Sequence, residues 1–206
     1  MGICVFCPKY RFQNNFKVGF TLSESLIYED EYIFVTPDLA PLVSGHLLIV
    51  SQKHYNSFSS APIEVKKALK KAMEHIYKSL GCQDITWFEH GAVFPGKGGA
   101  SIDHAHLHVL PCNLSVQKAV EYDNKYFQKE EFSIETFNSL ANKQPYLWIG
   151  NGLDSSNIYF VNYLPSQYLR NIIMQLQGSN VYNWKNSFME EESKEKYRET
   201  LKKILR

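Results

Sequence analysis

The sequence predicts an α+β fold in which antiparallel strands are crossed by one long helix. Short runs rich in β-branched and aromatic residues, bounded by turn residues, occur in the first half at 25–36, 45–51, 84–90 and 104–110. Between them, residues 60–81 carry apolar side chains every three or four positions, which is the period of a helix. Strands grouped around a single helix are typical of an antiparallel sheet with a helix on one face.

Each of these elements has its own local signal. Residues 25–36 indicate two short strands joined by the acidic turn 29–31, and residues 45–51 indicate a buried strand. Ser60 can cap the helix that follows, Gly81 can end it, and its lysine-rich face is expected to lie in solvent. Residues 84–90 predict a further strand, after which a glycine-rich loop leads to the alternating run 104–110.

The composition changes after Cys112. Residues 113–140 are polar and favour a helix-rich connection, and 146–149 and 158–163 favour two strands. Pro165 opens a helix that ends at Gly178, and the last residues are charged and helical. Gln167 and Arg170 could approach the phosphates from above, but we favour a role in which they cap and solvate this helix. We therefore expect one domain over residues 1–112 and a C-terminal α/β elaboration over 113–206 that packs on it.

Composition excludes several classes of protein. The chain has 206 residues, 44% of them hydrophobic, which suits a packed core, and its net charge of +1 argues against nucleic acid as the main partner. No run of about 18 apolar residues is present, and the N-terminus lacks the apolar core of a secretory signal. We expect a cytoplasmic protein that does not use a membrane and whose four cysteines are not a disulfide framework.

Three of the seven histidines fall at every second residue of one predicted strand: His104, His106 and His108. In a strand these side chains project to one face, whereas the apolar residues between them face the other side. Three imidazoles on one face repel when protonated and need partners when buried, so this spacing indicates chemistry.

The run His104-Ala105-His106-Leu107-His108-Val109-Leu110 resembles the defining motif of the histidine-triad (HIT) superfamily. The resemblance extends upstream through Asp38, through Gly45-His46 with its apolar strand, and through Lys53-His54, and it includes Gly99-Ala100-Ser101 before the triad. It covers roughly residues 4–112 and implies a HIT-like fold.

The resemblance implies a nucleotidyl hydrolase or transferase that works through a nucleotidyl-histidine intermediate. It implies His106 as the nucleophile at the α-phosphorus, His108 as the acid, and Ser101 and His46 beside the same site. It also implies that Asp38 accepts from the ribose hydroxyls and that Leu39 contributes to the wall around the base. Gly98 and Gly99 are expected to bind phosphate oxygens through their backbone N–H groups.

Two positions depart from the family pattern. Glu89 stands where many members have an amide that touches the phosphates, and Ala100 replaces a glutamine. We expect either a different substrate or a phosphate contact from His90 in place of Glu89. The expected partner is an adenine nucleotide, with dinucleoside polyphosphates among the candidates, and a homodimer is an allowed assembly.

The N-terminal Cys4-x-x-Cys7 pair is only half of a metal site, because zinc takes about four nitrogen or sulfur ligands. Similarity to zinc-containing HIT proteins and to galactose-1-phosphate uridylyltransferases implies that His54 and His104 complete it. The expected cofactor is a structural zinc held by Cys4, Cys7, His54 and His104.

Three alternatives stay open at this point. The triad histidines could all bind one metal ion, as in a mononuclear metal enzyme. The chain could be a non-enzymatic nucleotide-binding module, for which Trp87, Trp148 and Trp184 would supply stacking surfaces. Finally, the acceptor could be phosphate or a sugar phosphate instead of water, which would make the protein a phosphorylase or a nucleotidylyltransferase.

Overall fold

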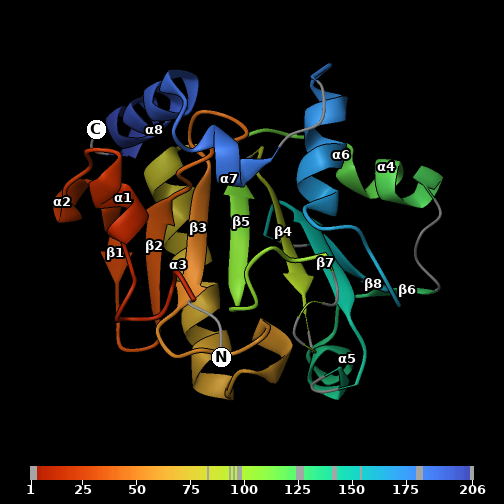
Figure 1. Ribbon diagram of the computed structural model, residues 1–206. Coiled ribbons are helices and arrows are strands. Elements are labelled where there is room, and N and C mark those ends of the chain that lie inside the picture. The colour runs from red at the N-terminus through yellow and green to blue at the C-terminus, as the bar shows by residue number, and fades with distance from the viewer. Residues whose placement is uncertain are drawn as a thin grey trace.

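A continuous antiparallel sheet forms the centre of the molecule (Figure 1). The computed structural model describes residues 4–82, 84–92, 94, 96, 99–123, 128–140, 143–153, 155–179 and 183–204. Within these residues the sheet has eight strands, in the spatial order β1 (Tyr28–Glu29), β2 (Ile33–Pro37), β3 (Leu47–Ser51), β5 (His106–Leu110), β4 (Thr86–Gly91), β7 (Tyr146–Asn151), β8 (Ser155–Phe160) and β6 (Gln128–Glu131). The predicted α+β class is confirmed.

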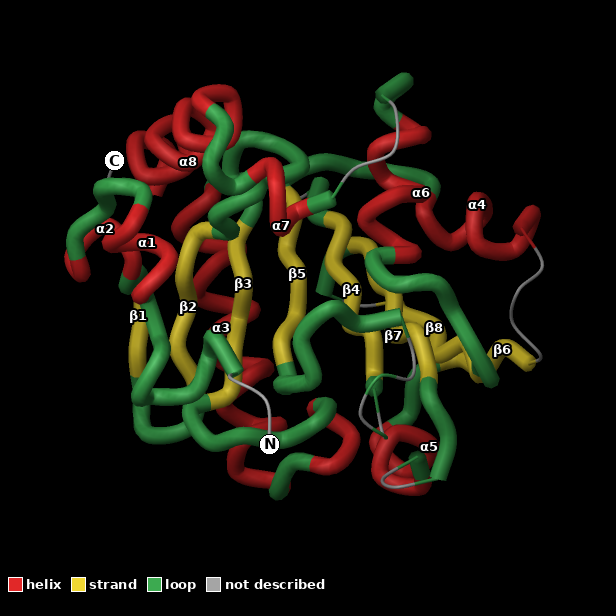
Figure 2. Tube along the Cα trace, viewed as in Figure 1, coloured by secondary structure: helices red, strands yellow, loops and turns green. Residues whose placement is uncertain are grey.

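Helices cover both faces of this sheet (Figure 2). They are α1 (Gln13–Lys17), α2 (Leu22–Ser25), α3 (Ile63–Leu80), α4 (Val116–Asp123), α5 (Ile134–Ser139), α6 (Tyr168–Leu176), α7 (Trp184–Ser187) and α8 (Glu191–Ile204), with a short 3-10 helix at Phe58–Ser60. The apolar stripe of α3 packs on one face against side chains such as Ile49, Leu107 and Trp148. Helices α4 and α6 pack on the opposite face, against Phe88 and Leu147 among others.

The long predicted helix is confirmed, but it begins later than its sequence suggests. Helix α3 starts at Ile63 with Pro62 as its N-cap, and no side chain caps it. The hydroxyl of Ser60 instead donates to the carbonyl oxygen of Ser57 within the 3-10 turn. Gly81 ends the helix in the left-handed conformation, as expected.

Strands from both parts of the chain share the sheet. Strand β7 pairs with β4 through six residue pairs, from Thr86–Asn151 to Gly91–Tyr146. The two strands approach so closely that a Cβ at Gly150 would lie 2.1 Å from the ring of Trp87, which explains the glycine there. The division of the chain at residue 112 stays a prediction, yet hydrogen bonding of the sheet continues across it.

Strand β6 and the small N-terminal helices were not predicted. Residues Gln128–Glu131 are mostly exposed and charged, as edge strands often are, so they carry no hydrophobic pattern. Helices α1 and α2 are too short to show a period. The predicted C-terminal helix is present as α8, where Tyr197 stacks on Phe20 with 3.8 Å between ring centroids.

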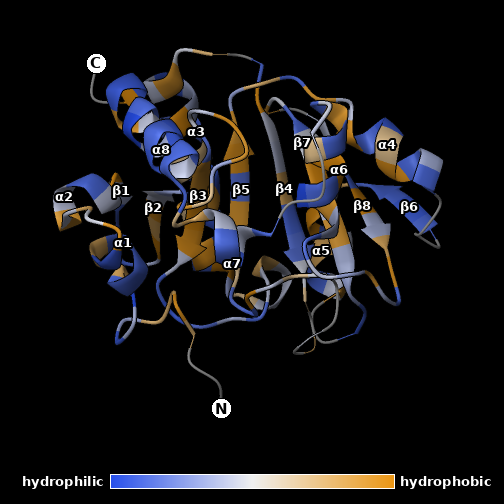
Figure 3. Ribbon diagram, turned by 45° about the horizontal axis from the view of Figure 1, so that its top comes forward, coloured by the Kyte–Doolittle hydropathy of each residue, from blue (hydrophilic) through white to orange (hydrophobic). Residues whose placement is uncertain are grey.

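Hydropathy follows this layering (Figure 3). The central strands carry apolar side chains, and α8 shows a largely hydrophilic surface. None of the described helices combines the length and the apolar character that a membrane crossing requires.

Candidate functional site

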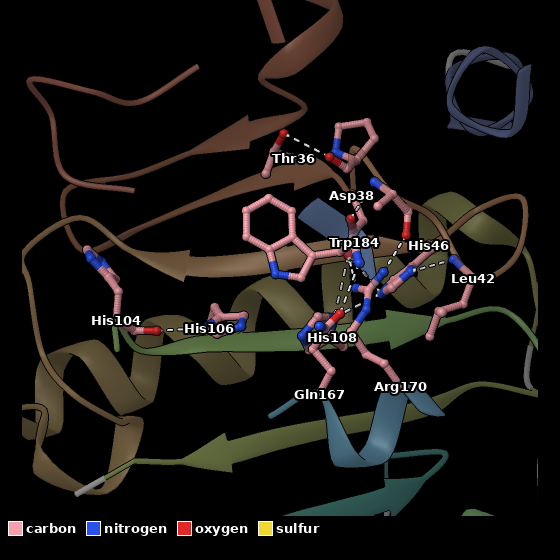
Figure 4. A network of polar contacts seen from close by, with 12 residues as sticks. Thr36, Asp38, Leu42, His46, His104, His106, His108, Gln167, Arg170 and Trp184 are labelled. Carbon is pink, nitrogen blue, oxygen red and sulfur yellow. Dashed lines mark hydrogen bonds and ion pairs between the residues drawn. The ribbon is translucent and has the colours of Figure 1, made fainter. Parts of the chain in front are cut away.

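A small cavity of about 90 Å³ lies on the sheet face opposite α3. Its lining comes from distant parts of the chain: the N-terminal segment, the β2–β3 connection, the triad strand and the C-terminal segment. The polar side chains that line it include Arg11, Asp38, His90, Ser101, His106, His108, Gln167 and Arg170. Figure 4 shows how Asp38, His46, His108 and Arg170 gather at one end of this site, with His106 and His104 further along the strand.

The middle histidine has one ring nitrogen fixed by the backbone. His106 donates its Nδ1–H to the carbonyl oxygen of His104 over 2.6 Å (Figure 4). The other nitrogen, Nε2, therefore carries the lone pair of the neutral ring. Burial lowers the pKa of His106 below its ordinary value, so the ring is neutral near pH 7. A neutral imidazole with a free lone pair is a good nucleophile.

The last triad histidine is oriented by a relay that starts at a backbone amide. Leu42 donates its N–H to Nδ1 of His46 over 3.1 Å. The proton of neutral His46 must then be on Nε2, which lies 3.0 Å from Nδ1 of His108. Nδ1 of His108 accepts a hydrogen bond from this N–H, and the ring proton of His108 is therefore on Nε2. A single peptide N–H thus determines the tautomers of two imidazoles.

Burial keeps this whole group of histidines uncharged. It lowers the pKa of His46 to about 3 and that of His90 to about 3, and it holds the pKa of His108 well below its ordinary value. The stacking of Phe88 on His108, with 4.4 Å between ring centroids, closes one side of that ring. The site therefore presents hydrogen-bond donors and acceptors at defined nitrogens without carrying imidazolium charge.

Asp38 is paired with an arginine that comes from the far end of the chain. Its Oδ2 accepts from Nη1 of Arg170 over 2.6 Å, and its Oδ1 accepts from the N–H of Ala40 over 2.8 Å. Burial alone would raise the pKa of Asp38, but the guanidinium of Arg170, His46 and the N–H of Ala40 together lower the pKa to about 2. The expectation that Arg170 solvates its helix is wrong, since only 5% of this residue is exposed.

Glu89, expected to contact substrate, is on the wrong face of the sheet for that role. Its carboxylate accepts from the N–H of Phe58 and from the hydroxyl of Tyr146, both over 2.7 Å, on the side that α3 covers. The alternation of a strand turns its neighbour His90 toward the cavity instead. The expectation is corrected accordingly: His90 lines the cavity, and its Nε2 accepts from the N–H of Leu169 over 3.2 Å.

We expect Glu89 to make stability fall as the pH rises through neutrality. Burial raises the pKa of Glu89 from 4.5 to about 7, so the folded state holds its proton more tightly than the unfolded state. Its stabilising contribution is then complete below about pH 4.5 and is lost as the pH passes about 7, by up to about 3 kcal/mol. Glu89→Gln, which keeps one acceptor and one donor group, should remove this dependence in denaturant unfolding between pH 5 and pH 8.

The control for this titration is the exposed Glu74→Gln on the outer side of α3. It should retain the pH dependence of the parent. A difference in unfolding free energy between the parent and Glu89→Gln that does not change with pH would contradict the expectation.

The other expected site residues lie at the rim of the cavity or nearby. Ser101 lines it, and its Oγ is 2.8 Å from Oγ of Ser166. Leu39 lines it as well and packs against a cluster that contains Phe20 and Tyr197. Gly99 has a positive φ of 78°, and its carbonyl oxygen accepts from the N–H of Gln167 over 2.8 Å. Gly98 is outside the described residues.

The four expected metal ligands are brought together at the other end of the triad strand. Sγ of Cys4 lies 3.3 Å from Nδ1 of His104, Sγ of Cys7 lies 3.4 Å from Nδ1 of His54, and all four ligand atoms are within 4.8 Å of one another. Tetrahedral zinc, with bonds of about 2.0–2.3 Å, separates its ligand atoms by roughly 3.3–3.8 Å. The set therefore fits such an ion without rearrangement of the fold.

The orientation of His104 also suits a ligand. Its Nε2–H donates to the carbonyl oxygen of Ser51 over 2.8 Å, which leaves Nδ1 unprotonated toward the sulfur atoms. Among the described residues, no group capable of holding a metal contains all three triad histidines; His108 falls in a separate one with Asp38 and His46. This separation disfavours the mononuclear alternative.

Phe6 was not found from the sequence as part of the site, and Trp184 and Arg170 entered only in less favoured alternatives, as a stacking surface and as a phosphate contact. Phe6 lies between the two cysteines, and its ring is 5.3 Å from that of His106 by centroids. Trp184 comes from α7, and only its type suggested stacking. Arg170 had one available signal: it is a cation within the apolar helical run of residues 168–176.

Comparisons with known proteins find a HIT domain in the first part of the chain. Residues 21–113 match the family model described as HIT domain. An uncharacterized HIT-like protein of Methanocaldococcus jannaschii is 28% identical over 113 residues, which are 53% of this chain and 78% of that protein. A HIT-like protein of Mycoplasma pneumoniae is 29% identical over 110 residues, or 52% and 70% of the two chains. A solved Zn-bound histidine triad family protein from Mycobacterium smegmatis is 21% identical, covers 57% of this chain and 80% of that one, and aligns with a TM-score of 0.33.

The matched segment contains the triad, His46, His54 and Asp38, while Cys4, Cys7 and Arg170 are outside it. With its intact His-x-His-x-His motif leading into the central strand β5 and the family match over residues 21–113, this segment of the chain is a HIT domain.

Proposed function

We propose that this protein is a nucleotidyl hydrolase or transferase that acts at the α-phosphate of a nucleoside phosphate ester, anhydride or phosphoramidate. At the general level, membership of the superfamily suggests a nucleotide-binding hydrolase or transferase. The observation that carries the specific proposal is the fixed tautomer of His106, whose Nε2 lone pair is available because Nδ1–H is bound to the His104 carbonyl.

The proposed reaction has two displacements at phosphorus. In the first, Nε2 of His106 attacks the α-phosphorus, an N–P bond forms, and the bond from phosphorus to the leaving group breaks. The leaving group departs with the bonding electron pair and accepts a hydrogen bond from the Nε2–H of His108, which the relay from Leu42 and His46 holds there. In the second, the oxygen of an acceptor such as water attacks phosphorus and its proton passes to the leaving group or to solvent. The N–P bond breaks, its electron pair returns to Nε2 of His106, and the nucleoside monophosphate leaves.

An adenine nucleotide is the proposed substrate. Flat side chains that suit a base line the cavity, namely Phe6, Phe12, Phe34 and Trp184. The cavity volume of about 90 Å³ is below the range of roughly 300–1,000 Å³ that ligand sites need, so substrate entry requires that part of this lining moves. Both Phe6 and Trp184 belong to short segments outside the sheet, which are easier to displace than the strands.

Zinc is the proposed cofactor, with a structural role. When bound by Cys4, Cys7, His54 and His104 it would cross-link the N-terminal segment to the triad strand. Because Phe6 lies between the cysteines and His104 accepts from His106 at its carbonyl, this link would hold two neighbours of the nucleophile in position.

The proposal is tested by a substrate panel with and without inorganic phosphate. Dinucleoside polyphosphates, adenosine phosphoramidates, adenylated amines and nucleotide sugars are incubated with the zinc-loaded protein. Samples are quenched at alkaline pH, where an N–P bond to histidine survives, and are analysed by mass spectrometry. We expect a nucleoside monophosphate product and an increment of one nucleotidyl group on the peptide that contains His106. A nucleoside diphosphate formed from added phosphate would identify a phosphorylase, and cleavage of none of these compounds would favour a binding module.

The relay through His46 should affect turnover in a graded way. In His46→Gln the amide nitrogen can still reach Nδ1 of His108 as a donor, whereas in His46→Asn the side chain is too short. We expect a loss in kcat of about 100-fold for His46→Asn, in the range for loss of one oriented hydrogen-bond donor to the leaving group, and a much smaller loss for His46→Gln. Equal losses in both variants, with unchanged thermal stability, would contradict the relay.

A further inference from the structure

We propose that the C-terminal segment removes ribose recognition from this site, because Arg170 takes the position of a sugar hydroxyl as the donor to Asp38. The inference rests on the proposed nucleotide-binding function and concerns its specificity. It predicts a protein that accepts ribonucleotides and deoxyribonucleotides almost equally.

Both carboxylate oxygens of Asp38 already accept hydrogen bonds from donors of the protein. Oδ1 accepts from the N–H of Ala40 and Oδ2 from Nη1 of Arg170. Arg170 also donates from Nη2 to the carbonyl oxygen of Ala40, so its guanidinium is held at two points. A guanidinium bound at two points is held more rigidly than a lysine ammonium or a hydroxyl would be.

The remaining approaches to the Asp38 carboxylate are covered by other side chains of the protein. The side chain of Asp38 is only 8% exposed. Nε2 of His46 lies 3.6 Å and Nδ1 of His108 3.7 Å from Oδ2, on the side of the triad strand. A ribose hydroxyl could bond to this oxygen only after Arg170 withdrew.

The charges of Asp38 and Arg170 also oppose replacement of Arg170 by a ribose hydroxyl. The ion pair between Asp38 and Arg170 is buried, and the histidines around it are neutral at pH 7. Removal of the cation would leave a buried carboxylate without compensation, which is strongly unfavourable. A neutral hydroxyl is a poor replacement for a guanidinium, so binding of ribose does not drive the exchange.

Arg170 belongs to the C-terminal segment of the chain. It lies on α6, outside the matched HIT domain, and reaches across the sheet face to the β2–β3 connection (Figure 4). Figure 4 shows its side chain extending from the α6 ribbon to Asp38 and His46. The helix is anchored there by two further contacts: its Leu169 N–H donates to His90, and the N–H of Gln167 donates to Gly99. The C-terminal segment is thus part of the nucleotide site.

The test is calorimetric binding of AMP, 2′-deoxy-AMP and 3′-deoxy-AMP to the zinc-loaded full chain. A hydrogen bond to a charged group changes affinity by roughly 10- to 100-fold, so loss of a recognised hydroxyl would be obvious. We expect the three dissociation constants of the parent to agree within about threefold. In Arg170→Gln, where Asp38 becomes accessible, AMP should bind at least about tenfold more tightly than one of the deoxy nucleotides.

Two controls address folding and charge. Arg170→Lys keeps a cation at Asp38 and should show the parental lack of preference. The double variant Asp38→Asn/Arg170→Gln has no unpaired buried charge, and it should show no strong preference either, because the acceptor is neutral. Thermal melting of all variants identifies any that fail to fold.

The possible results separate this inference from the proposed function. A preference of the parent for AMP of tenfold or more overturns the inference, as does an Arg170→Gln variant with unchanged selectivity. If none of the three nucleotides binds, the inference and the nucleotide-binding function both fail. If binding follows the expected pattern but His106 never becomes nucleotidylated, the inference stands and the proposed catalysis alone is wrong.

Discussion

Replacement of His106 by alanine should abolish nucleotidyl transfer while the protein stays folded. The side chain is 8% exposed, and its Nδ1–H is bound to the backbone of its own strand, so its removal deletes one hydrogen bond and a ring at the edge of a cavity. The chemical step, by contrast, has no other described nucleophile with a free lone pair and a fixed orientation in the cavity. We expect kcat to fall by about 10⁴-fold or more, as for other covalent nucleophiles.

The measurement needs a control that removes a histidine without touching the site. His75 on α3 is exposed and lies on the opposite face of the sheet, so His75→Ala should keep full turnover. His106→Asn should be as inactive as His106→Ala. Turnover above about a tenth of the parent in both His106 variants, or a nucleotidyl group trapped on another residue, would reject the assignment.

The parts of the site that follow from strand alternation could be predicted from the sequence. The period of two in residues 104–108 places three imidazoles on one face, and the resemblance to the superfamily adds His46 and the zinc ligands. These residues come together because β3 and β5 pair in register, with Leu48 opposite His108 and Val50 opposite His106.

The parts that depend on long-range packing could not be predicted. Which face of β4 carries Glu89 follows from the register of that strand with β5, and a local motif does not contain that information. Arg170 is a stronger example, since it meets Asp38 across 132 positions of sequence. Only the rule that a buried cation needs an anionic partner connects it to the site, and that rule does not name the partner.

Loss of the N-terminal metal ligands should cost this protein more in stability than in chemistry. Cys4 and Cys7, among the first described residues of the chain, lie against His54 and His104, which follow strand β3 and precede strand β5. Binding of zinc to a preformed set of this kind contributes directly to folding free energy. Metal analysis of tag-free protein should find one zinc per chain, and Cys4→Ser or Cys7→Ser should lower its content and the melting temperature by about 10 °C, equivalent to a few kcal/mol at this chain length.

A chelator should reproduce this destabilisation in the parent and have little effect on the two variants. Cys82→Ser is the matched control, because the thiol of this cysteine donates to the carbonyl oxygen of Asp84 and is not part of the metal-ligand group. Residual turnover in Cys4→Ser at a temperature where it is folded should stay within about tenfold of the parent, since the nucleophile does not bind the metal. Less than a tenth of an equivalent of zinc in the parent would reject the metal site. A melting temperature unaffected by the chelator in zinc-loaded protein would instead reject its structural role, because an ion that cross-links the N-terminal segment to the triad strand cannot leave without weakening the folded state.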